Sequence, residues 1–432
     1  TAGGSVLLTI SNNIGFDING IYIVTVFEDT DLDRNFNPDE DNILGSASAS
    51  GEHDAGDDKI ITVNLSGHTL FLNNLVYAFA EPGPAAIDTD MSNNILNNMS
   101  GITYTQPAGS ISPVIEWQWI AGSELPASDQ VMCAPVVINL NDDNGDGAVD
   151  NNDIPDIVFH KFISNNYTLN GTLRAISGDG SGELFTVSSY RTSPGANPAA
   201  GDIDGDGLPE IITLQENVNG QYMLLAFENN GTHKWTSTEG TSHYLTSIAI
   251  ADIDMDGSPD IIAGSLVLNS DGSTKWRGSG GTGRLASIAA NIDMEGDMEV
   301  VAGNTAYRSD GSLYWQNTSV QDGFPGIGNF DNDIYPEIVV VGRSGADAFI
   351  YMLEHDGQLK WGPVFFRTTA TSQNGGGSAP TVADIDSDGH TDIVFSTTDR
   401  LIALEADGSV KWSITINDPS SGVSGVSIFD LD

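Results

Sequence analysis

An internal repeat in which two short motifs alternate constrains the fold of this chain more than any other feature. The first motif is Asn-Gly or Asp-Gly followed by tryptophan four residues after the glycine, and an apolar run such as residues 223–227 precedes it. This order of residue types is typical of a β-hairpin. We expect the tryptophans to be packing residues, because the same position recurs in every unit. They are Trp235, Trp276, Trp315, Trp361 and Trp412.

The second motif is an acidic loop that leads into a β-branched, aliphatic run, as residues 202–210 lead into residues 211–214. Copies start at positions 139, 202, 252, 291, 329, 384 and 430, a period of roughly 40 to 60 residues. Each unit therefore consists of a strand, an acidic loop, a strand, a hairpin and a tryptophan-bearing strand. Four short strands at this period predict the blades of a β-propeller.

We therefore predict an all-β chain in two parts. Residues 109–432 form a seven-bladed-type β-propeller whose last blade is truncated, because no residues follow Asp432 to supply its other strands. Residues 115–119 carry two tryptophans and are a candidate for an N-terminal strand that completes a blade. Residues 1–108 alternate apolar and polar residues and have the length of a seven-strand β-sandwich.

The acidic loops have the residue types and spacing of calcium sites. Carboxylates at loop positions 1, 3, 5 and 9, with glycine at 6, fold their oxygens onto one centre, and Ca²⁺ takes about six to eight oxygen ligands. Zinc or copper would favour His and Cys, which these positions lack. The predicted ligands are Asp202, Asp204, Asp206, Glu210, Asp252, Asp254, Asp256, Asp260, Asn291, Asp293, Glu295, Glu299, Asn329, Asp331, Asp333, Glu337, Asp384, Asp386, Asp388 and Asp392, and Asp430 and Asp432 begin a further copy.

Two other stretches have the spacing of an EF-hand loop. The first is an insertion in the acidic loop that starts at Asn139, with ligand types at positions 1, 3, 5, 9 and 12 and glycine at 6. Its predicted ligands are Asp142, Asn144, Asp146, Asp150 and Asp153. The second stretch has Arg34 where glycine is expected, which weakens the prediction. Its predicted ligands are Asp29, Asp31, Asp33 and Glu40.

Residues 109–432 resemble the FG-GAP repeat family, whose best-known members are the integrin α-subunit propellers. The D-x-D-x-D-G loop of that family is matched at Asp202, Asp252 and Asp384, and an Ala-Pro element precedes the loop at residues 134–135 and 379–380. The resemblance implies several bound Ca²⁺ ions. Three features depart from the family pattern: Glu at position 9, Asn at position 1 in two loops, and no glycine after Asp333.

Residues 1–108 look like the adhesion-related Ig-like modules of bacterial and archaeal surface proteins. That resemblance implies a secreted or cell-surface protein. The start of the chain has no Met and no charged-then-apolar signal segment, so we expect an internal piece of a longer protein. Sequons that would fit a glycosylated surface protein lie at Asn64, Asn98, Asn166, Asn170, Asn230 and Asn317.

The charge of the chain excludes several classes of partner. Its 60 acidic and 15 basic residues give a net charge of -45, which argues against nucleic acid and against attachment to anionic lipid. No apolar run has the length of about 18 residues that a membrane span needs, so we expect no membrane insertion. The one cysteine, Cys133, excludes an internal disulfide and is expected to be a buried thiol.

Two functions remain open. One is adhesion, with a cell-surface or extracellular-matrix protein or a glycan as partner. The other is a structural subunit that self-associates into a fibre, stalk or surface layer. We expect no catalysis, because H-E-x-x-H and G-x-S-x-G are absent and G-x-G-x-x-G at residues 278–283 opens no helix. An enzyme would be a polysaccharide lyase or hydrolase on a propeller.

Overall fold

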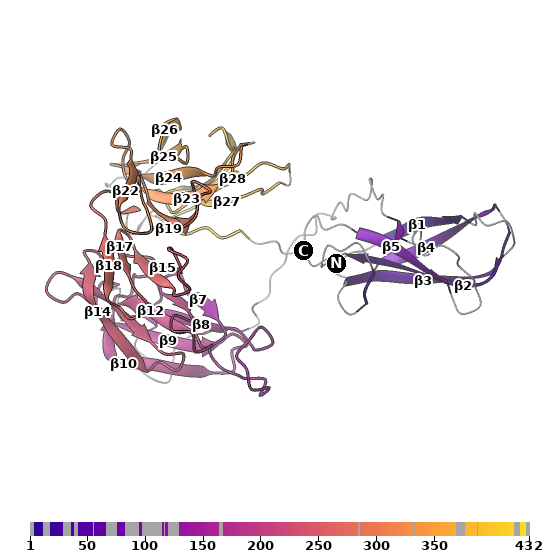
Figure 1. Ribbon diagram of the computed structural model, residues 1–432, viewed down its shortest axis with the longest axis horizontal. Helices are drawn as coiled ribbons and strands as arrows, with labels where there is room; N and C mark the ends of the chain where they lie inside the picture. Colours follow the sequence, from indigo (N-terminus) through magenta and orange to yellow (C-terminus); the bar gives the residue numbers. More distant parts are fainter. Residues whose placement is uncertain are drawn as a thin grey trace. The chain divides into compact units, whose positions relative to one another are not determined.

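The computed structural model describes the chain except residues 1–3, 12–17, 29–35, 39–41, 55, 66–75, 83–94, 97–114, 116, 120–128, 164–166, 284–285, 332, 369–375, 387, 419–423 and 429–432. The described residues form β-strands and no α-helix (Figure 1). None of them therefore forms a helix that could cross a membrane. The chain divides into two compact units: unit 1 is Thr1–Val114 with Phe429–Asp432, and unit 2 is Ile115–Ile428.

The described residues of unit 2 form six four-stranded antiparallel sheets, here called blades 1 to 6, and in each blade the strands follow one another in chain order. Blade 1 is β7 (Val136–Ile138), β8 (Asp156–Lys161), β9 (Gly171–Ser177) and β10 (Glu183–Thr192). Blade 2 is β11 (Ala199–Gly201), β12 (Glu210–Leu214), β13 (Tyr222–Phe227) and β14 (His233–Thr241). Blade 3 is β15 (Ile248–Ala251), β16 (Asp260–Ala263), β17 (Leu266–Leu268) and β18 (Thr274–Arg277).

Blade 4 is β19 (Ile288–Ala290), β20 (Glu299–Ala302), β21 (Thr305–Tyr307) and β22 (Leu313–Gln316). Blade 5 is β23 (Phe324–Gly328), β24 (Glu337–Ser344), β25 (Asp347–Leu353) and β26 (Leu359–Arg367). Blade 6 is β27 (Thr381–Ala383), β28 (Asp392–Ser396), β29 (Arg400–Leu404) and β30 (Val410–Thr415). The first strands of successive blades contact one another, from β7 through β11, β15, β19 and β23 to β27. This serial packing of four-stranded sheets makes unit 2 β-propeller-like, and the seventh blade stays a prediction.

The core of unit 2 lies between neighbouring blades. The second strand of blades 2, 3, 4 and 6 is buried along its whole length, because both faces of the sheet are covered. Ile212 and Leu224 of blade 2, for example, pack with Ile261 and Leu266 of blade 3 in one cluster. The aliphatic runs that follow the acidic loops in the sequence are therefore the strands that hold adjacent blades together.

Four tryptophans of the repeat, Trp235, Trp276, Trp315 and Trp361, pack on the hairpin glycine of the next blade. A Cβ atom added to Gly272 would lie 2.7 Å from the ring of Trp235, and the glycine has φ +81°. Trp235 Nε1 also donates a hydrogen bond to the carbonyl of Ser270 at 2.9 Å. The predicted packing role is thereby confirmed for these four tryptophans, and that of Trp412 stays a prediction. The same stacking joins Trp276 to Gly311, Trp315 to Gly357, Trp361 to Gly408, Phe185 to Gly231 and Trp117 to Gly180.

Buried polar side chains also lie away from the loop of blade 1, and His160 is one of them. His160 lies between two threonine hydroxyls, with Nδ1 2.9 Å from Thr192 Oγ1 and Nε2 2.7 Å from Thr213 Oγ1. Burial lowers the pKa of His160 to about 3. Cys133 is buried, as predicted, and burial raises the pKa of its thiol to about 11.

Unit 1 has two sheets that share one core. The sheet of β1 (Gly4–Ser11) and β4 (Asp58–Leu65) supplies Leu8 and Ile61. The second sheet has the order β3–β2–β5–β6, and its strands β2 (Ile18–Glu28) and β3 (Asn42–His53) supply Val24 and Leu44. Its other two strands are β5 (Val76–Pro82) and β6 (Ile95–Leu96). The Ig-like topology stays a prediction.

Candidate metal sites on the acidic loops

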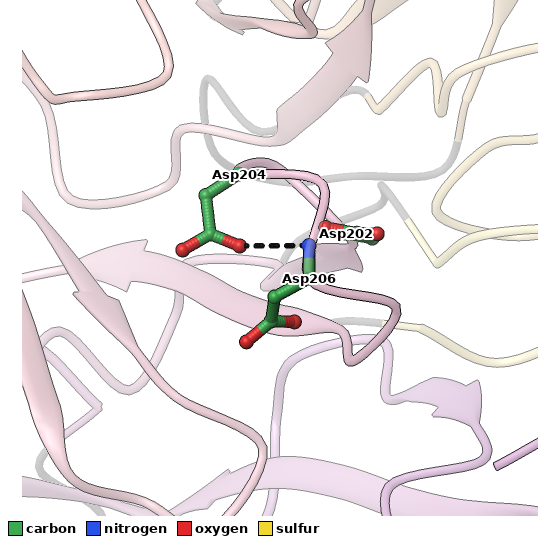
Figure 2. A group of neighbouring side chains, drawn as sticks. All are labelled: Asp202, Asp204 and Asp206. Atoms are coloured by element: carbon green, nitrogen blue, oxygen red, sulfur yellow. Dashed lines mark hydrogen bonds between the residues drawn. The ribbon is translucent and has the colours of Figure 1, made fainter. Parts of the chain in front are cut away.

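The acidic loops connect the first and second strands of the blades. In blade 2, one carboxylate oxygen from each of Asp202, Asp204 and Asp206 lies within 4.8 Å of the other two (Figure 2). Asp202 accepts hydrogen bonds from the backbone N–H groups of Gly205 at 2.7 Å and Gly207 at 2.9 Å. Both glycines have positive φ, at +80° and +87°. Glycine at position 6 therefore allows the turn that gathers the three carboxylates.

The loop of blade 3 has the same geometry. Asp252, Asp254 and Asp256 lie within the same 4.8 Å limit, and Asp252 accepts from the backbone N–H of Gly257 at 2.9 Å. Position 4 of this loop is Met255, which has φ +54° without being glycine. The left-handed conformation at position 4 therefore occurs with glycine in blade 2 and with methionine in blades 3 and 4, at Gly205, Met255 and Met294.

The carboxylate at loop position 9 is buried in blades 1 to 6, and in blades 2 to 6 it is held from two sides. Glu210 Oε2 accepts a hydrogen bond from the backbone N–H of Ile203 at 2.9 Å, and its Oε1 lies 3.2 Å from Lys234 Nζ. Burial raises the pKa of Glu210, Asp260 and Glu299 although a cation lies beside each. At most 2% of each position-9 acid is exposed. These acids are Asp156, Glu210, Asp260, Glu299, Glu337 and Asp392.

The loops of blades 4 and 5 have asparagine at position 1 and use it differently. Asn291 Nδ2 donates to the carbonyl of Gly296 at 3.2 Å, and Asn329 Nδ2 donates to the carbonyl of Asp333 at 2.8 Å. Among the described residues, the carboxylates predicted for blade 4 form no group of three within 4.8 Å. Those ligands are Asp293, Glu295 and Glu299.

In blades 5 and 6 only some of the predicted loop ligands lie together in one group. Blade 5 gathers Asp331 and Glu337 with Glu354, whereas Asp333 lies outside the group. Blade 6 gathers Asp384, Asp386 and Asp392, whereas Asp388 lies outside. Sequence reasoning missed Glu354. A signal was available in the spacing, because Glu354 lies six residues before Lys360 in the hairpin. The pairs Glu228 and Lys234, and Glu405 and Lys411, have the same spacing.

The insertion in the loop of blade 1 forms a turn of the expected kind. Asp142 accepts from the backbone N–H groups of Gly145 at 2.7 Å and Gly147 at 2.9 Å. Asp153 accepts from the N–H groups of residues 143, 144 and 150, and these bonds lower its pKa. Asp150 caps the N–H of Asn152. Among the described residues, the carboxylates of this insertion form no group of three within 4.8 Å.

Several predicted ligands lie outside the described residues. They are Asp29, Asp31, Asp33, Glu40, Asp430 and Asp432.

The residues present fit a hard divalent cation. Carboxylate and amide oxygens form the donor set, with no His or Cys in any of the groups. Buried oxygens without a hydrogen-bond partner are uncommon in proteins and call for an explanation such as a bound ion. In the described part of the chain such oxygens recur on these loops, at Oδ1 of Asn139, Asn141, Asp156, Asp254 and Asn291. The acidic clusters could therefore bind metal ions.

A sequence profile of the FG-GAP-like repeat matches residues 202–263 and 329–395. The chain therefore contains FG-GAP-like repeats, and the matches include the acidic loops of blades 2, 3, 5 and 6. No curated protein sequence matches the chain.

Among solved structures, the biofilm matrix protein Bap1 of V. cholerae is similar at 28% identity with a TM-score of 0.53. The similarity covers 70% of this chain and 56% of Bap1, so the chain spans little more than half of that protein.

Rhamnogalacturonan lyases are also among the similar structures. YesW matches at 16% identity and TM-score 0.44, over 91% of this chain and 71% of its own. The lyase PL11 of Bacillus licheniformis matches at 15% identity with a TM-score of 0.43, and the match covers 95% of this chain and 68% of PL11. These matches contradict the expectation of no catalysis drawn from the sequence. That expectation was wrong because it rested on missing short motifs, whereas catalytic groups can come from distant parts of a chain.

Proposed function

We propose that this chain is an extracellular calcium-binding protein that acts in adhesion, within a matrix or at a cell surface. The observation that carries the proposal is the recurrence of one acidic loop at blade intervals, with three carboxylate oxygens within 4.8 Å in four blades. The similarity of the chain to the biofilm matrix protein Bap1 supports the proposed extracellular setting.

Electrostatics favours calcium at the loops. In blade 2 the loop carries Asp202, Asp204, Asp206 and Glu210, and Lys234 forms ion pairs with Asp204 and Glu210. Their mutual repulsion is strongest without a counter-ion, so a divalent cation that binds only the folded loop stabilises the blade. The all-oxygen donor set and the tolerant loop geometry suit Ca²⁺ better than zinc or copper.

The proposed partner is a cell-surface or matrix protein or a glycan. A net charge of -45 repels polyanions, which leaves neutral or cationic surfaces as the direct partners of the chain. Acidic polymers would need calcium to bridge them to the loops.

Binding of the purified chain to an array of neutral and acidic polysaccharides tests the proposal, with calcium in one arm and EDTA in the other. We expect binding that EDTA abolishes and that Asp202→Asn, Asp204→Asn and Asp206→Asn together weaken. A control with the same change in charge combines Asp54→Asn, Asp57→Asn and Asp129→Asn, three exposed acids outside the loops. Equal binding with calcium and with EDTA, or equal loss in both triple variants, would contradict the proposal.

A further inference from the structure

Five blades place one cationic side chain at the same point, between the carboxylates of loop positions 3 and 9. In blade 3, for example, Lys275 Nζ lies 2.6 Å from Asp254 and 2.9 Å from Asp260. In the other four blades the cationic nitrogen likewise lies close to the carboxylate of position 3 and to that of position 9. These two distances are 2.5 and 3.2 Å for Lys234, 3.1 and 3.5 Å for Arg308, 2.6 and 2.7 Å for Lys360, and 2.8 and 3.1 Å for Lys411. The point therefore lies within reach of both loop positions in each of these blades.

Blade 4 shows that the cation, and not one particular residue, is the constant feature. In the other four blades the lysine occupies a β-bulge one residue before the tryptophan, as Lys275 does before Trp276. Blade 4 has Tyr314 at that bulge. The guanidinium comes instead from Arg308, which directly follows the neighbouring strand β21, and it lies over the Tyr314 ring, 4.2 Å from the ring centroid. A buried position-9 carboxylate thus meets a positive charge even where the lysine is replaced.

Blade 1 has no such side chain at the equivalent positions. Leu184 occupies the bulge before Phe185, and Ser177 stands where blade 4 has Arg308. The position-9 acid of this blade is Asp156, which accepts a hydrogen bond from the backbone N–H of Leu140 at 2.9 Å, as its counterparts do. Asp156 is fully buried, and its other oxygen, Oδ1, has no hydrogen-bond partner.

Two further unpartnered oxygens belong to the same loop. Asn139 and Asn141 stand at loop positions 1 and 3, and Oδ1 of each is buried without a hydrogen-bond partner. Asn139 Nδ2 donates to the carbonyl of Asp150, as Asn291 and Asn329 do to their own loops. The amide nitrogen is thereby engaged, and the amide oxygen is left for another ligand.

The surroundings of Asp156 are negative. The charges that act most strongly on it are those of Asp143, Asp153 and Asp179, all of the same sign. A buried carboxylate among like charges is unfavourable unless a cation compensates it. In blade 1 the two positions that supply a lysine or an arginine in blades 2 to 6 hold Leu184 and Ser177, so neither position compensates the charge of Asp156.

We propose that blade 1 binds a Ca²⁺ ion through Asp156, Asn139 and Asn141, at the point that a lysine or arginine side chain fills in blades 2 to 6. Three side-chain oxygens leave room for water and backbone carbonyl ligands, as Ca²⁺ requires about six to eight. This site is separate from the EF-hand-like insertion at Asp142–Asp153. The proposal rests on the calcium chemistry of the proposed function but not on the loops of the other blades.

Calcium bound per chain, measured by equilibrium dialysis with radioactive calcium at a free concentration of about 1 mM, tests the site. We expect Leu184→Lys to remove one ion, because the new ammonium would occupy the site as Lys275 does in blade 3. Leu184→Met is the matched control and should retain the ion. Asp156→Asn provides a second variant of nearly unchanged shape, and it should also remove one ion.

The same measurement separates this site from the others. Asp146→Asn, in the insertion, should leave the effect of Leu184→Lys intact. Failure of the proposed function would appear as an unchanged count in the Asp202, Asp204 and Asp206 triple variant, with Leu184→Lys still removing an ion. An unchanged count in both folded Leu184→Lys and folded Asp156→Asn would overturn the blade 1 site, whatever the other loops bind.

Discussion

Blades 3 and 4 are neighbours with the same architecture and different loops. In both, the tryptophan pairs with the same register position of the third strand, Trp276 with Val267 and Trp315 with Ala306. In both, the position-9 acid accepts the backbone N–H of position 2. The strands, the hairpin and the buried acid are thus common to the two blades.

The difference lies in the groups that would hold a cation. Blade 3 gathers three aspartates around Asp252, whereas Asn291 of blade 4 donates its amide to the loop carbonyl of Gly296. Lys275 has 18% of its side chain exposed, and Arg308 has 45%. The comparison teaches that the blade fold does not depend on the ligand set, so fold and cation binding can be perturbed separately.

The largest effect should come from removing the lysine of blade 3. Lys275→Met leaves Asp260 buried without its partner and should lower the free energy of unfolding by ~3 kcal/mol in EDTA. Arg308→Met should lower it by about 1 kcal/mol, because the guanidinium is half exposed and screened by solvent. Urea unfolding followed by tryptophan fluorescence measures both, since all seven tryptophans lie in unit 2. Equal losses of unfolding free energy in the two variants would contradict the proposed difference between blades 3 and 4.

Exchanging the position-1 residues should exchange calcium binding. Asp252→Asn should abolish stabilisation by the blade 3 site, which at calcium a hundredfold above Kd amounts to about 2.7 kcal/mol. Asn291→Asp should add calcium-dependent stability to blade 4. Urea unfolding with calcium and with EDTA checks both variants. If calcium-dependent stability stayed the same in both variants, the assignment of the position-1 residue as a ligand would be wrong.

Changes at the hairpin glycines should affect both blades alike. Gly272→Ala and Gly311→Ala place a Cβ 2.7 and 2.6 Å from a tryptophan ring, at φ +81° in each case. Strain and overpacking together should lower the free energy of unfolding by about 2 kcal/mol with or without calcium. Gly220→Ala is the control, with φ +91° and open space around the Cβ, and should lower it by about 1 kcal/mol. A loss confined to one blade would show that the stacking is not shared.

A further effect concerns pH and sets the conditions for comparing the blades. The pKa of His160 in blade 1 is about 3, below the value near 6.5 expected in the unfolded chain, so protonation favours unfolding. Stability is full above pH 6.5 and should fall by about 1.4 kcal/mol per pH unit as the pH drops below it. His160→Gln should reduce this slope in EDTA and leave the blade 3 and blade 4 differences unchanged. An unchanged slope would assign the pH dependence elsewhere.

The repeat pattern predicted much of unit 2 because its signals are local. A β-hairpin requires only an apolar run, Asp271-Gly272 and Trp276, and glycine at position 6 directly specifies the left-handed turn, as at Gly257. Local spacing likewise placed Asp202, Asp204 and Asp206 in one group. Each of these inferences spans fewer than about ten residues, within which backbone geometry fixes side-chain direction.

The parts that the sequence did not reveal depend on contacts across strands. Lys234 reaches Asp204, 30 residues earlier, because a β-bulge directs its side chain toward the loop. No spacing rule predicts that contact. The spacing of Glu354 from Lys360 is visible in the sequence, but the approach of Glu354 to Asp331 and Glu337 in blade 5 depends on the fold. The donation by Asn291 to its own loop was also hidden, since asparagine offers both an acceptor and donors and only the folded loop selects between them.

The central claim is that cations on the acidic loops stabilise the blades. Thermal unfolding of unit 2 by tryptophan fluorescence, with calcium and with EDTA and with bound metal measured in both samples, tests it most directly. Loss of several ions should lower the melting temperature by at least about 10 °C. Identical melting in the two samples, with no calcium retained by the folded chain, would contradict the account.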